Sequence, residues 1–218
     1  MAPSPSEVKA VLWDFGGVFT SSPFEAFNRY EAAHGLPHDL VRRINTLNPD
    51  TNAWARLERS ELSADAFDRA FDEESRALGY SIPGRDILAI LSGSLRPRVV
   101  GAFKACKAKF KVGCITNNAP TGQGPSMTSS PEKAREIAEV FSLFDHVIES
   151  SKAGLRKPDP RIYAMMCEAL NVEPGTCVYL DDLGINLKPA REMGMTTIKV
   201  GSEAQLLADL SKAVGLSF

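Results

Sequence analysis

Short apolar runs and longer amphipathic stretches alternate along this chain. Apolar runs rich in Val, Ile and Leu lie near residues 8–13, 111–118, 146–148, 177–180 and 196–200. Runs of this kind, without polar alternation, are typical of strands buried on both faces of a parallel sheet. The stretches between most of them carry apolar residues every three to four positions, as amphipathic helices do. The alternation therefore predicts an α/β protein with a doubly wound, Rossmann-like parallel sheet.

The region between the first two predicted strands differs, because it holds helical patterns and no strand. Its first helix is predicted over 23–33, where Ser22 and Pro23 have the character of an N-cap and a first helical residue. Two further helices are predicted over 39–47 and 63–78. Such a block is too long for a loop within a compact domain.

This block therefore predicts two domains. We expect residues 1–20 and 96–218 to form an α/β core domain that is discontinuous in sequence. Residues 21–95, called the helical insert below, are expected to form a second, smaller domain inserted after the first strand.

Two helices in the rest of the chain are predicted together with the roles of particular residues. Over residues 96–109, the apolar positions expected to be buried are Val99, Val100, Phe103 and Ala105. Further along, Ser129 and Glu132 have the spacing of a capping box, which predicts that a helix begins at Ser129.

Composition excludes several classes of function. The 218 residues are 44% hydrophobic and 24% charged, and 25 Lys and Arg against 27 Asp and Glu give a net charge of −2. This charge provides no electrostatic basis for binding nucleic acid or an anionic membrane. No apolar run approaches the ~18 residues of a membrane-spanning helix, and the first residues lack the features of a signal peptide. The cysteines form no Cys-x-x-Cys pair, so we expect a cytoplasmic protein with reduced core thiols at Cys106, Cys114, Cys167 and Cys177.

Polar side chains with catalytic potential follow four of the predicted strands. In chain order they are Asp14, then Thr116 and Asn117, then Lys157, then Asp181 and Asp182. The carboxyl ends of parallel strands meet along one edge of a sheet, so we expect these groups to lie close together. Crowded carboxylates repel one another, and a hard divalent cation such as Mg²⁺ relieves that repulsion while binding phosphate oxygens. With a lysine and a hydroxyl nearby, the pattern predicts phosphoryl transfer through a carboxylate nucleophile.

Four short motifs give the pattern a family resemblance. They are DFGGV at 14–18, ITNN at 115–118, KPD at 157–159 and YLDD at 179–182. In this order they resemble the four motifs of the haloacid dehalogenase superfamily of hydrolases, and the helical insert resembles that superfamily's small α-helical cap. The stretches 144–163 and 180–191 are closer still to the N-terminal phosphatase domains of mammalian soluble epoxide hydrolases, and to the related domain of an acyl-CoA dehydrogenase family member.

The resemblance implies a catalytic role for several motif residues. Asp14 would be the nucleophile and would form an aspartyl-phosphate. Thr116 and the backbone of Asn117 would hold the phosphoryl group of a small phosphorylated substrate. Lys157 would neutralise the charges of Asp14 and of the phosphate.

The same resemblance implies a Mg²⁺ cofactor. Asp14, the backbone carbonyl of Gly16 and the carboxylate of Asp182 would bind the ion directly. Asp181 would bind it directly or through a water molecule.

Gly16 departs from the superfamily pattern. Phosphatases of this superfamily usually carry a second Asp there, which protonates the leaving group and then activates water. General acid–base catalysis contributes roughly 10²–10⁴-fold. The loss leaves three possibilities: substrates with good leaving groups, such as acyl, aryl or anomeric phosphates; a proton from Glu58, Arg59 or Glu61 in the helical insert; or ligand binding with little turnover.

Three interpretations follow. The first is a Mg²⁺-dependent phosphatase of small phosphorylated metabolites. The second is a metal-independent hydrolase of the dehalogenase type, which also lacks the second Asp, although the pair Asp181 and Asp182 indicates a metal. The third is a catalytically weak module that binds phosphorylated ligands. Specificity would lie in the helical insert and in residues 119–130, and the substrate and the oligomeric state stay open.

Overall fold

The computed structural model describes residues 7–91, 93–119 and 130–218. Its strands are β1 (Ala10–Trp13), β2 (Lys111–Thr116), β3 (His146–Glu149), β4 (Cys177–Asp181) and β5 (Thr196–Lys199). They form a five-stranded sheet in the order β3-β2-β1-β4-β5, in which every neighbouring pair is parallel. The doubly wound parallel sheet predicted from the alternation is confirmed.

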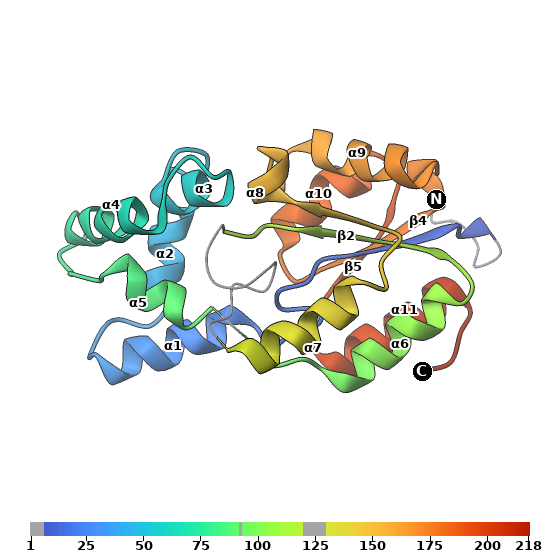
Figure 1. Cartoon of the computed structure of the whole chain (residues 1–218), viewed down its shortest axis with the longest axis horizontal. Helices are drawn as coiled ribbons and strands as arrows, with labels where there is room; N and C mark the ends of the chain where they lie inside the picture. Colours follow the sequence, from blue (N-terminus) through green and yellow to red (C-terminus); the bar gives the residue numbers. More distant parts are fainter. Residues whose placement is uncertain (1–6, 92, 120–129) are drawn as a thin grey trace.

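Helices cover both faces of this sheet. One face carries α6 (Pro97–Lys107), α7 (Pro131–Phe141) and α11 (Glu203–Val214), and the other carries α9 (Pro160–Leu170) and α10 (Gly184–Glu192). The sheet runs between these two layers in Figure 1. A short helix, α8 (Ser150–Ala153), directly follows β3, and a 3-10 turn, η3 (Pro174–Thr176), precedes β4.

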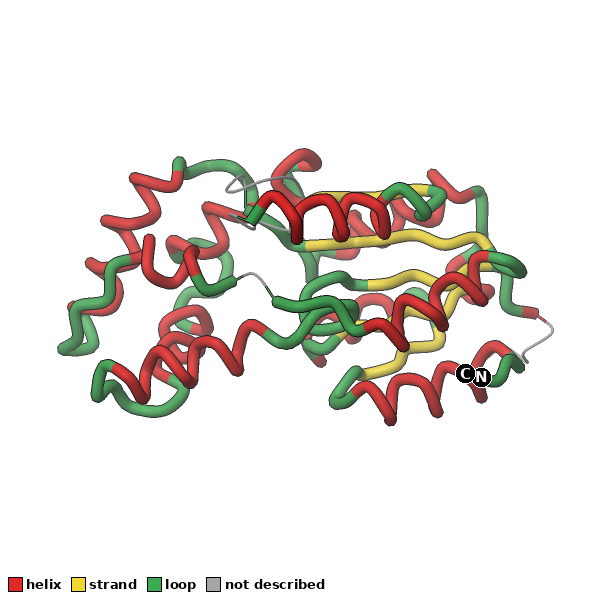
Figure 2. Tube along the Cα trace, turned by 60° about the horizontal axis from the view of Figure 1, so that its bottom comes forward, coloured by secondary structure: helices red, strands yellow, loops and turns green. Residues whose placement is uncertain are grey.

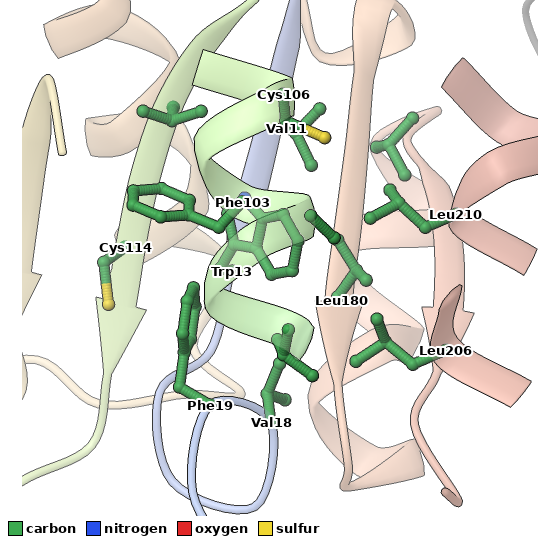
Figure 3. Close-up of a cluster of buried hydrophobic side chains, with 14 of the residues drawn as sticks. Val11, Trp13, Val18, Phe19, Phe103, Cys106, Cys114, Leu180, Leu206 and Leu210 are labelled. Carbon is green, nitrogen blue, oxygen red and sulfur yellow. The ribbon is translucent and has the colours of Figure 1, made fainter. Parts of the chain in front are cut away.

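Side chains of β1 alternate between two hydrophobic cores. Val11 and Trp13 face the layer that contains α6, while their neighbours in the strand face the layer that contains α9. Figure 3 shows Trp13 beside Phe103 of α6 and Phe19 of the turn after β1. The ring centroid of Trp13 lies 5.8 Å from that of Phe103 and 5.1 Å from that of Phe19. This aromatic packing fixes the turn that follows Asp14 to the core.

The helical insert has a hydrophobic cluster of its own. Its helices are α1 (Pro23–Ala33), α2 (Leu40–Thr46), α3 (Ala53–Glu58), α4 (Ala64–Arg76) and α5 (Gly84–Ala89). They pack around a set of buried side chains that includes Phe27, Ile44, Leu57, Phe67 and Phe71. Figures 1 and 2 show these helices gathered at one end of the sheet and its two helical layers.

The chain enters and leaves the insert through two adjacent segments. Thr20 and Leu95 form an antiparallel bridge, and the N–H of Ser21 donates to the carbonyl of Ser94 at 3.0 Å. The N–H of Arg96 donates to the carbonyl of Phe19 at 2.7 Å. The two connections are therefore tied together immediately after the turn that follows Asp14.

Local helix signals were reliable where a polar cap was present. Ser22 caps α1 by accepting from the N–H of Phe24, and Ser63 caps α4. Two predictions are wrong. Ala105 is exposed, because α6 turns the alternative positions Ala102 and Cys106 toward the core. The predicted cap Ser129 lies outside the described residues, and Ser130 caps α7 instead, since Pro131 takes the first helical position.

Two composition-based expectations concern cysteines and membrane spans. All four cysteines are buried free thiols. Cys106 and Cys114 belong to the core on the α6 side, and Cys167 and Cys177 to the core on the α9 side. Within the described ranges, no helix is both long enough and apolar enough to cross a membrane.

Candidate active site

Lys157 lies at the centre of a cluster of charged side chains at the carboxyl edge of the sheet. Its Nζ is 2.8 Å from Oδ1 of Asp14, which directly follows β1, and 2.8 Å from Oδ2 of Asp181, the last residue of β4. The strand ends meet because Trp13 pairs with Leu180 in the sheet. Lys157 is only 1% exposed. A lysine this deeply buried remains charged only with such partners.

Both oxygens of Asp181 are occupied by protein donors. Oδ1 accepts from the N–H of Leu183 at 2.8 Å and from Nδ2 of Asn186 at 3.0 Å. Oδ2 accepts from Nζ of Lys157 at 2.8 Å and from the hydroxyl of Tyr179. Nδ2 of Asn186 also lies 3.1 Å from Oδ2. A carboxylate has about four lone-pair sites, so donors from four residues leave Asp181 little capacity to bind a metal ion. Its geometry instead fixes the position of Lys157.

Asp182 faces the turn that follows Asp14. A side chain at Gly17 would collide with it, because an ideal Cβ there lies 2.2 Å from Oδ2 of Asp182. Gly17 also has a φ of +74°, a left-handed conformation that glycine adopts most easily. Arg96 holds the turn, since its Nη1 donates to the carbonyls of Gly17 at 2.9 Å and Val18 at 3.2 Å. Glycine and arginine together allow the turn to approach Asp182.

The charges of this cluster do not balance. With the three carboxylates ionised and the Lys157 ammonium group charged, the cluster carries a net charge of −2. Burial raises the pKa of Asp14 well above its usual value, and the charges of Asp181 and Asp182 add to this effect against the opposing charge of Lys157. Burial and the charge of Asp181 raise the pKa of Asp182 to about 6. Burial alone would lower the pKa of Lys157, but the charges of Asp14 and Asp181 outweigh it and keep the pKa above its usual range.

The donor set fits a hard divalent cation such as Mg²⁺. Carboxylate oxygens of Asp14, Asp181 and Asp182 lie within 4.8 Å of one another. The donors that Asp14 meets within the described part of the chain, the N–H of Phe15 and Nζ of Lys157, both bind Oδ1. Oxygen ligands, a lone pair on Asp14 and a net charge of −2 are what such an ion requires. Asp14 and Asp182 are therefore the carboxylates suited to hold it.

The residues after β2 reach the same edge of the sheet. Thr116, the last residue of β2, is buried there. The Asn117 side chain forms two hydrogen bonds with the backbone of Lys157. Its Oδ1 accepts from the Lys157 N–H at 2.9 Å, and its Nδ2 donates to the Lys157 carbonyl at 3.1 Å. The structure thus brings Thr116, Asn117 and Lys157 to the edge that carries Asp14. It also adds a contact that the sequence did not predict, the support of the Lys157 loop by the Asn117 side chain.

Gly16 offers open space at the position of the missing acid. The residue is exposed, and an ideal Cβ there meets no atom within 4 Å among the residues that the structure describes. Its backbone φ lies outside the left-handed region. A longer side chain therefore has room at Gly16, unlike at Gly17.

The three residues considered as replacement acids are engaged in ion pairs. Arg59 and Glu61 pair with each other, with Nε of Arg59 2.6 Å from Oε1 of Glu61, and this hydrogen bond lowers the pKa of Glu61. Glu58 is buried, with Oε2 2.7 Å from Nε of Arg156 and Oε1 accepting from the indole N–H of Trp54 at 2.9 Å. The hydrogen bond from Arg59 favours the ionised form of Glu61, which is a poor proton donor.

Sequence reasoning missed several residues that support the site. Tyr179 was detectable, because alternation along a strand places it on the same face as Asp181. Asn186 lies in the first turn of α10 and does not stand at the end of a strand, so only the fold shows its hydrogen bond to Asp181. Arg96 acts across 79 positions of sequence, and no local pattern connects it with Gly17.

Comparisons with known proteins identify relatives of this chain. Residues 8–194 match the family model for haloacid dehalogenase-like hydrolases. The chain is 31% identical over 222 residues to bifunctional epoxide hydrolase 2 of Mus musculus, covering 97% of this chain and 40% of that protein. It therefore spans less than half the length of this relative.

A shorter relative matches over most of its length. The chain is 28% identical over 206 residues to a phosphatase of Mycobacterium tuberculosis, covering 91% of this chain and 89% of that protein. Among solved structures, the HAD family enzyme BT-2542 of Bacteroides thetaiotaomicron, in complex with magnesium and inorganic phosphate, superimposes with a TM-score of 0.60. It is 17% identical, with 90% of this chain and 96% of that chain covered, so the likeness concerns the fold.

Proposed function

The chain belongs to the haloacid dehalogenase-like hydrolases, and on this basis we propose that it is a Mg²⁺-dependent phosphatase of small phosphorylated metabolites. The observation that carries the proposal is the cluster of Asp14, Lys157 and Asp182, which combines a nucleophile, a buried cation and carboxylates suited to a divalent ion. Relatives support it: the similar protein of M. tuberculosis is a phosphatase, and BT-2542 was crystallised with magnesium and phosphate.

Asp14 is the nucleophile in this proposal. Its Oδ1 is held by Lys157 and by the Phe15 N–H, so Oδ2 is directed at the substrate phosphorus. Attack forms the bond between Oδ2 and phosphorus while the bond from phosphorus to the leaving oxygen breaks, which yields an aspartyl-phosphate. The leaving oxygen departs as an anion and takes a proton from solvent. Water then attacks this phosphorus while the bond from phosphorus to Oδ2 breaks, and the attacking water loses a proton to solvent, which releases inorganic phosphate and regenerates the Asp14 carboxylate.

Three groups stabilise the phosphoryl oxygens during transfer. The Thr116 hydroxyl and the backbone N–H of Asn117 donate hydrogen bonds to them. Lys157 supplies positive charge in a buried site, where electrostatic stabilisation is strongest. Asp181 acts through Lys157, because donors from three other residues hold its carboxylate and that carboxylate in turn holds the ammonium group beside Asp14.

Asp14, Asp182 and the backbone carbonyl of Gly16 would hold Mg²⁺. When bound, the ion cancels the net charge of the cluster and screens the nucleophile from the charge of the phosphate. Asp182 is the better carboxylate ligand of the adjacent pair, since the oxygens of Asp181 are already committed to protein donors. Asp181 serves the ion at most through water.

Gly16 sets the substrate preference in this account. No carboxylate at this position protonates the leaving group, so phosphates with good leaving groups react fastest. The second half of the reaction is affected as well, because no carboxylate at Gly16 activates the attacking water. We therefore expect the aspartyl-phosphate to accumulate during turnover.

The helical insert is proposed to act as the cap. Residues 21–95 would form one domain and residues 1–20 with 96–218 the other, joined by the paired connections at Thr20 and Leu95. The separate hydrophobic cluster of the insert supports this division. As a cap, the insert would cover the site from the side of Asp14 and select the substrate.

Gly16 also favours a second candidate function. A site that keeps the nucleophile, the lysine and the metal ligands but lacks the acid is suited to bind phosphorylated ligands with little turnover. The two candidates differ in one quantity, the rate on an activated phosphate ester.

Hydrolysis of an aryl phosphate, measured with Mg²⁺ and with EDTA, tests the proposal. The expected result is turnover that requires Mg²⁺ and disappears in Asp14→Asn, the variant that keeps the size of the side chain. Turnover that persists in EDTA would indicate the dehalogenase type of chemistry. Binding of phosphate without turnover would identify the ligand-binding module.

A further inference from the structure

A partly buried ion pair joins the helical insert to the loop that carries Lys157. Oε2 of Glu58, the last residue of α3, lies 2.7 Å from Nε of Arg156, and the two side chains are 10% and 19% exposed. The residues are 98 positions apart in sequence. Arg156 also donates through Nη1 to the carbonyl of Pro49 at 2.8 Å, so its guanidinium contacts the insert at two points.

Neighbouring contacts fix the same junction. The hydroxyl of Ser150, the first residue of α8, donates to the carbonyl of Glu58 at 2.8 Å, and the hydroxyl of Ser60 donates to the carbonyl of Ser151 at 2.7 Å. Figure 1 shows α3 and α8 facing each other across the junction between the insert and the rest of the chain. The ion pair therefore belongs to a built interface.

This junction is one residue away from the catalytic lysine. Arg156 directly precedes Lys157, whose backbone is gripped on both sides by the Asn117 side chain. Asn118, which follows Asn117 in the sequence, donates its N–H to the Ser150 hydroxyl at 3.0 Å, and the same hydroxyl donates to the carbonyl of Glu58. The ion pair and the Asn117 grip are thus two supports of one loop, one from the insert and one from the end of β2.

We propose that Glu58 and Arg156 are positioning residues for Lys157. With the insert docked, Glu58 holds the Arg156 guanidinium and thereby the backbone of the Lys157 loop. Displacement of α3 would release that support and loosen the ammonium group beside Asp14. The pair in this way links docking of the insert to the position of a catalytic charge. The inference rests on the proposed phosphatase function and deepens it.

The placement of Glu58 suits this role better than a purely structural one. It is an acid at the carboxyl end of a helix, where the helix dipole disfavours negative charge. It also accepts from a second donor, since the Trp54 indole N–H donates to its Oε1 at 2.9 Å. Each oxygen of its carboxylate therefore has a donor, which fixes the orientation that a positioning side chain needs.

Kinetics of single and double variants test the pair. The variants are Glu58→Gln, Arg156→Gln and their combination. Arg76→Gln is the matched control, because Arg76 makes a 2.8 Å ion pair with Asp72 within α4 of the insert. Kinetic constants for an aryl phosphate are measured at saturating Mg²⁺, and unfolding temperatures verify that each variant is folded. Trp54 emission reports the state of Glu58, because the Trp54 indole N–H donates to the Glu58 carboxylate. The other tryptophan, Trp13, lies fully buried in the core on the α6 side and does not belong to this junction.

The expected result is a loss of kcat by about tenfold in each single variant, with a smaller change in KM, because Lys157 acts on the transition state. The double variant should lose no more than either single one, since both changes remove the same support. The emission of Trp54 should shift in the Glu58 and Arg156 variants, whereas Arg76→Gln should match the wild type in every readout.

Four outcomes separate the possibilities. Folded variants with wild-type kcat, beside an active wild type, overturn the inference and leave the phosphatase function intact. Additive losses in the double variant also overturn it, because the residues would then act independently. If a variant does not fold, Glu58→Asp and Arg156→Lys, which retain the charges, replace it and should show intermediate kcat values; wild-type values would overturn the inference. An inactive wild type refutes the proposed function, and the positioning role falls with it.

Discussion

Replacing Asp182 by Asn should stabilise the metal-free protein. The pKa of Asp182 rises from its ordinary value of 3.8 to about 6 on folding, because of burial and the charge of Asp181. A rise of about two pH units corresponds to ~3 kcal/mol of destabilisation by the ionised carboxylate at neutral pH, at 1.36 kcal/mol per unit. The carboxylate also accepts a bond from its own N–H, so we expect a net gain of about 2 kcal/mol in Asp182→Asn.

The neighbouring substitution should have the opposite sign. In Asp181→Asn, the donors of Lys157, Tyr179, Leu183 and Asn186 lose a buried anion that binds all four. Breaking a buried pair from one side costs about 3–5 kcal/mol. Two adjacent aspartates of one motif thus differ in their effect on stability, because the charge of Asp181 is satisfied by protein donors, whereas the charge of Asp182 is disfavoured by burial and by Asp181.

Thermal unfolding in EDTA at pH 7.5 measures both effects. At about 2–4 °C per kcal/mol for a chain of this size, Asp182→Asn should raise Tm by about 4–8 °C, and Asp181→Asn should lower it by more than about 6 °C. A folded pKa above the unfolded one means that the cost is present above pH ~6 and absent below pH ~4. The advantage of Asp182→Asn should therefore shrink as the pH falls through this window. Destabilisation by Asp182→Asn at pH 7.5 would refute the reasoning.

Three further predictions concern catalysis. Gly16→Asp should raise kcat for alkyl phosphates, which have poor leaving groups, by roughly 10²–10⁴-fold in steady-state assays, because the space around Gly16 is open; an unchanged rate in a folded variant would contradict this. The Mg²⁺ concentration for half-maximal activity should rise by about tenfold per pH unit below pH 6, since Asp182 must lose its proton to bind the ion; a flat profile would count against Asp182 as a ligand. Arg96→Ala should free the turn at Gly17 and Val18 and raise the same concentration by about tenfold; calorimetric Mg²⁺ affinity equal to that of the wild type would exclude this role.

The sheet was predictable because its signals are local. Apolar runs such as Val178-Tyr179-Leu180 are buried on both faces and end in polar residues, so a single window of sequence contains both the strand and its functional end. Ser22 and Ser63 marked their helices for the same reason. The short helices α3 and α5 were not predicted individually, because six residues provide too few turns for a periodic pattern.

The residues that meet at the candidate site were predictable from the sequence, but the separate role of each residue was not. The strand order placed Asp14, Lys157 and Asp181 together, and the sequence order of the motifs was enough to anticipate it. Asp181 and Asp182 differ in role because Tyr179 and Asn186 donate hydrogen bonds to Asp181, and only the packed fold specifies the positions of these donors. Long-range contacts of this kind leave no trace in a local pattern.

Phosphorylation of Asp14 during turnover is the most direct test of the account. The wild type would be mixed with Mg²⁺ and an aryl phosphate, quenched in acid within a few turnovers, and the peptide containing Asp14 examined by mass spectrometry. Because Gly16 provides no base to activate water, we predict that a large fraction of this peptide carries one phosphoryl group, located on Asp14 and absent from Asp14→Asn. An enzyme that turns over while this peptide remains unmodified would contradict the central claim.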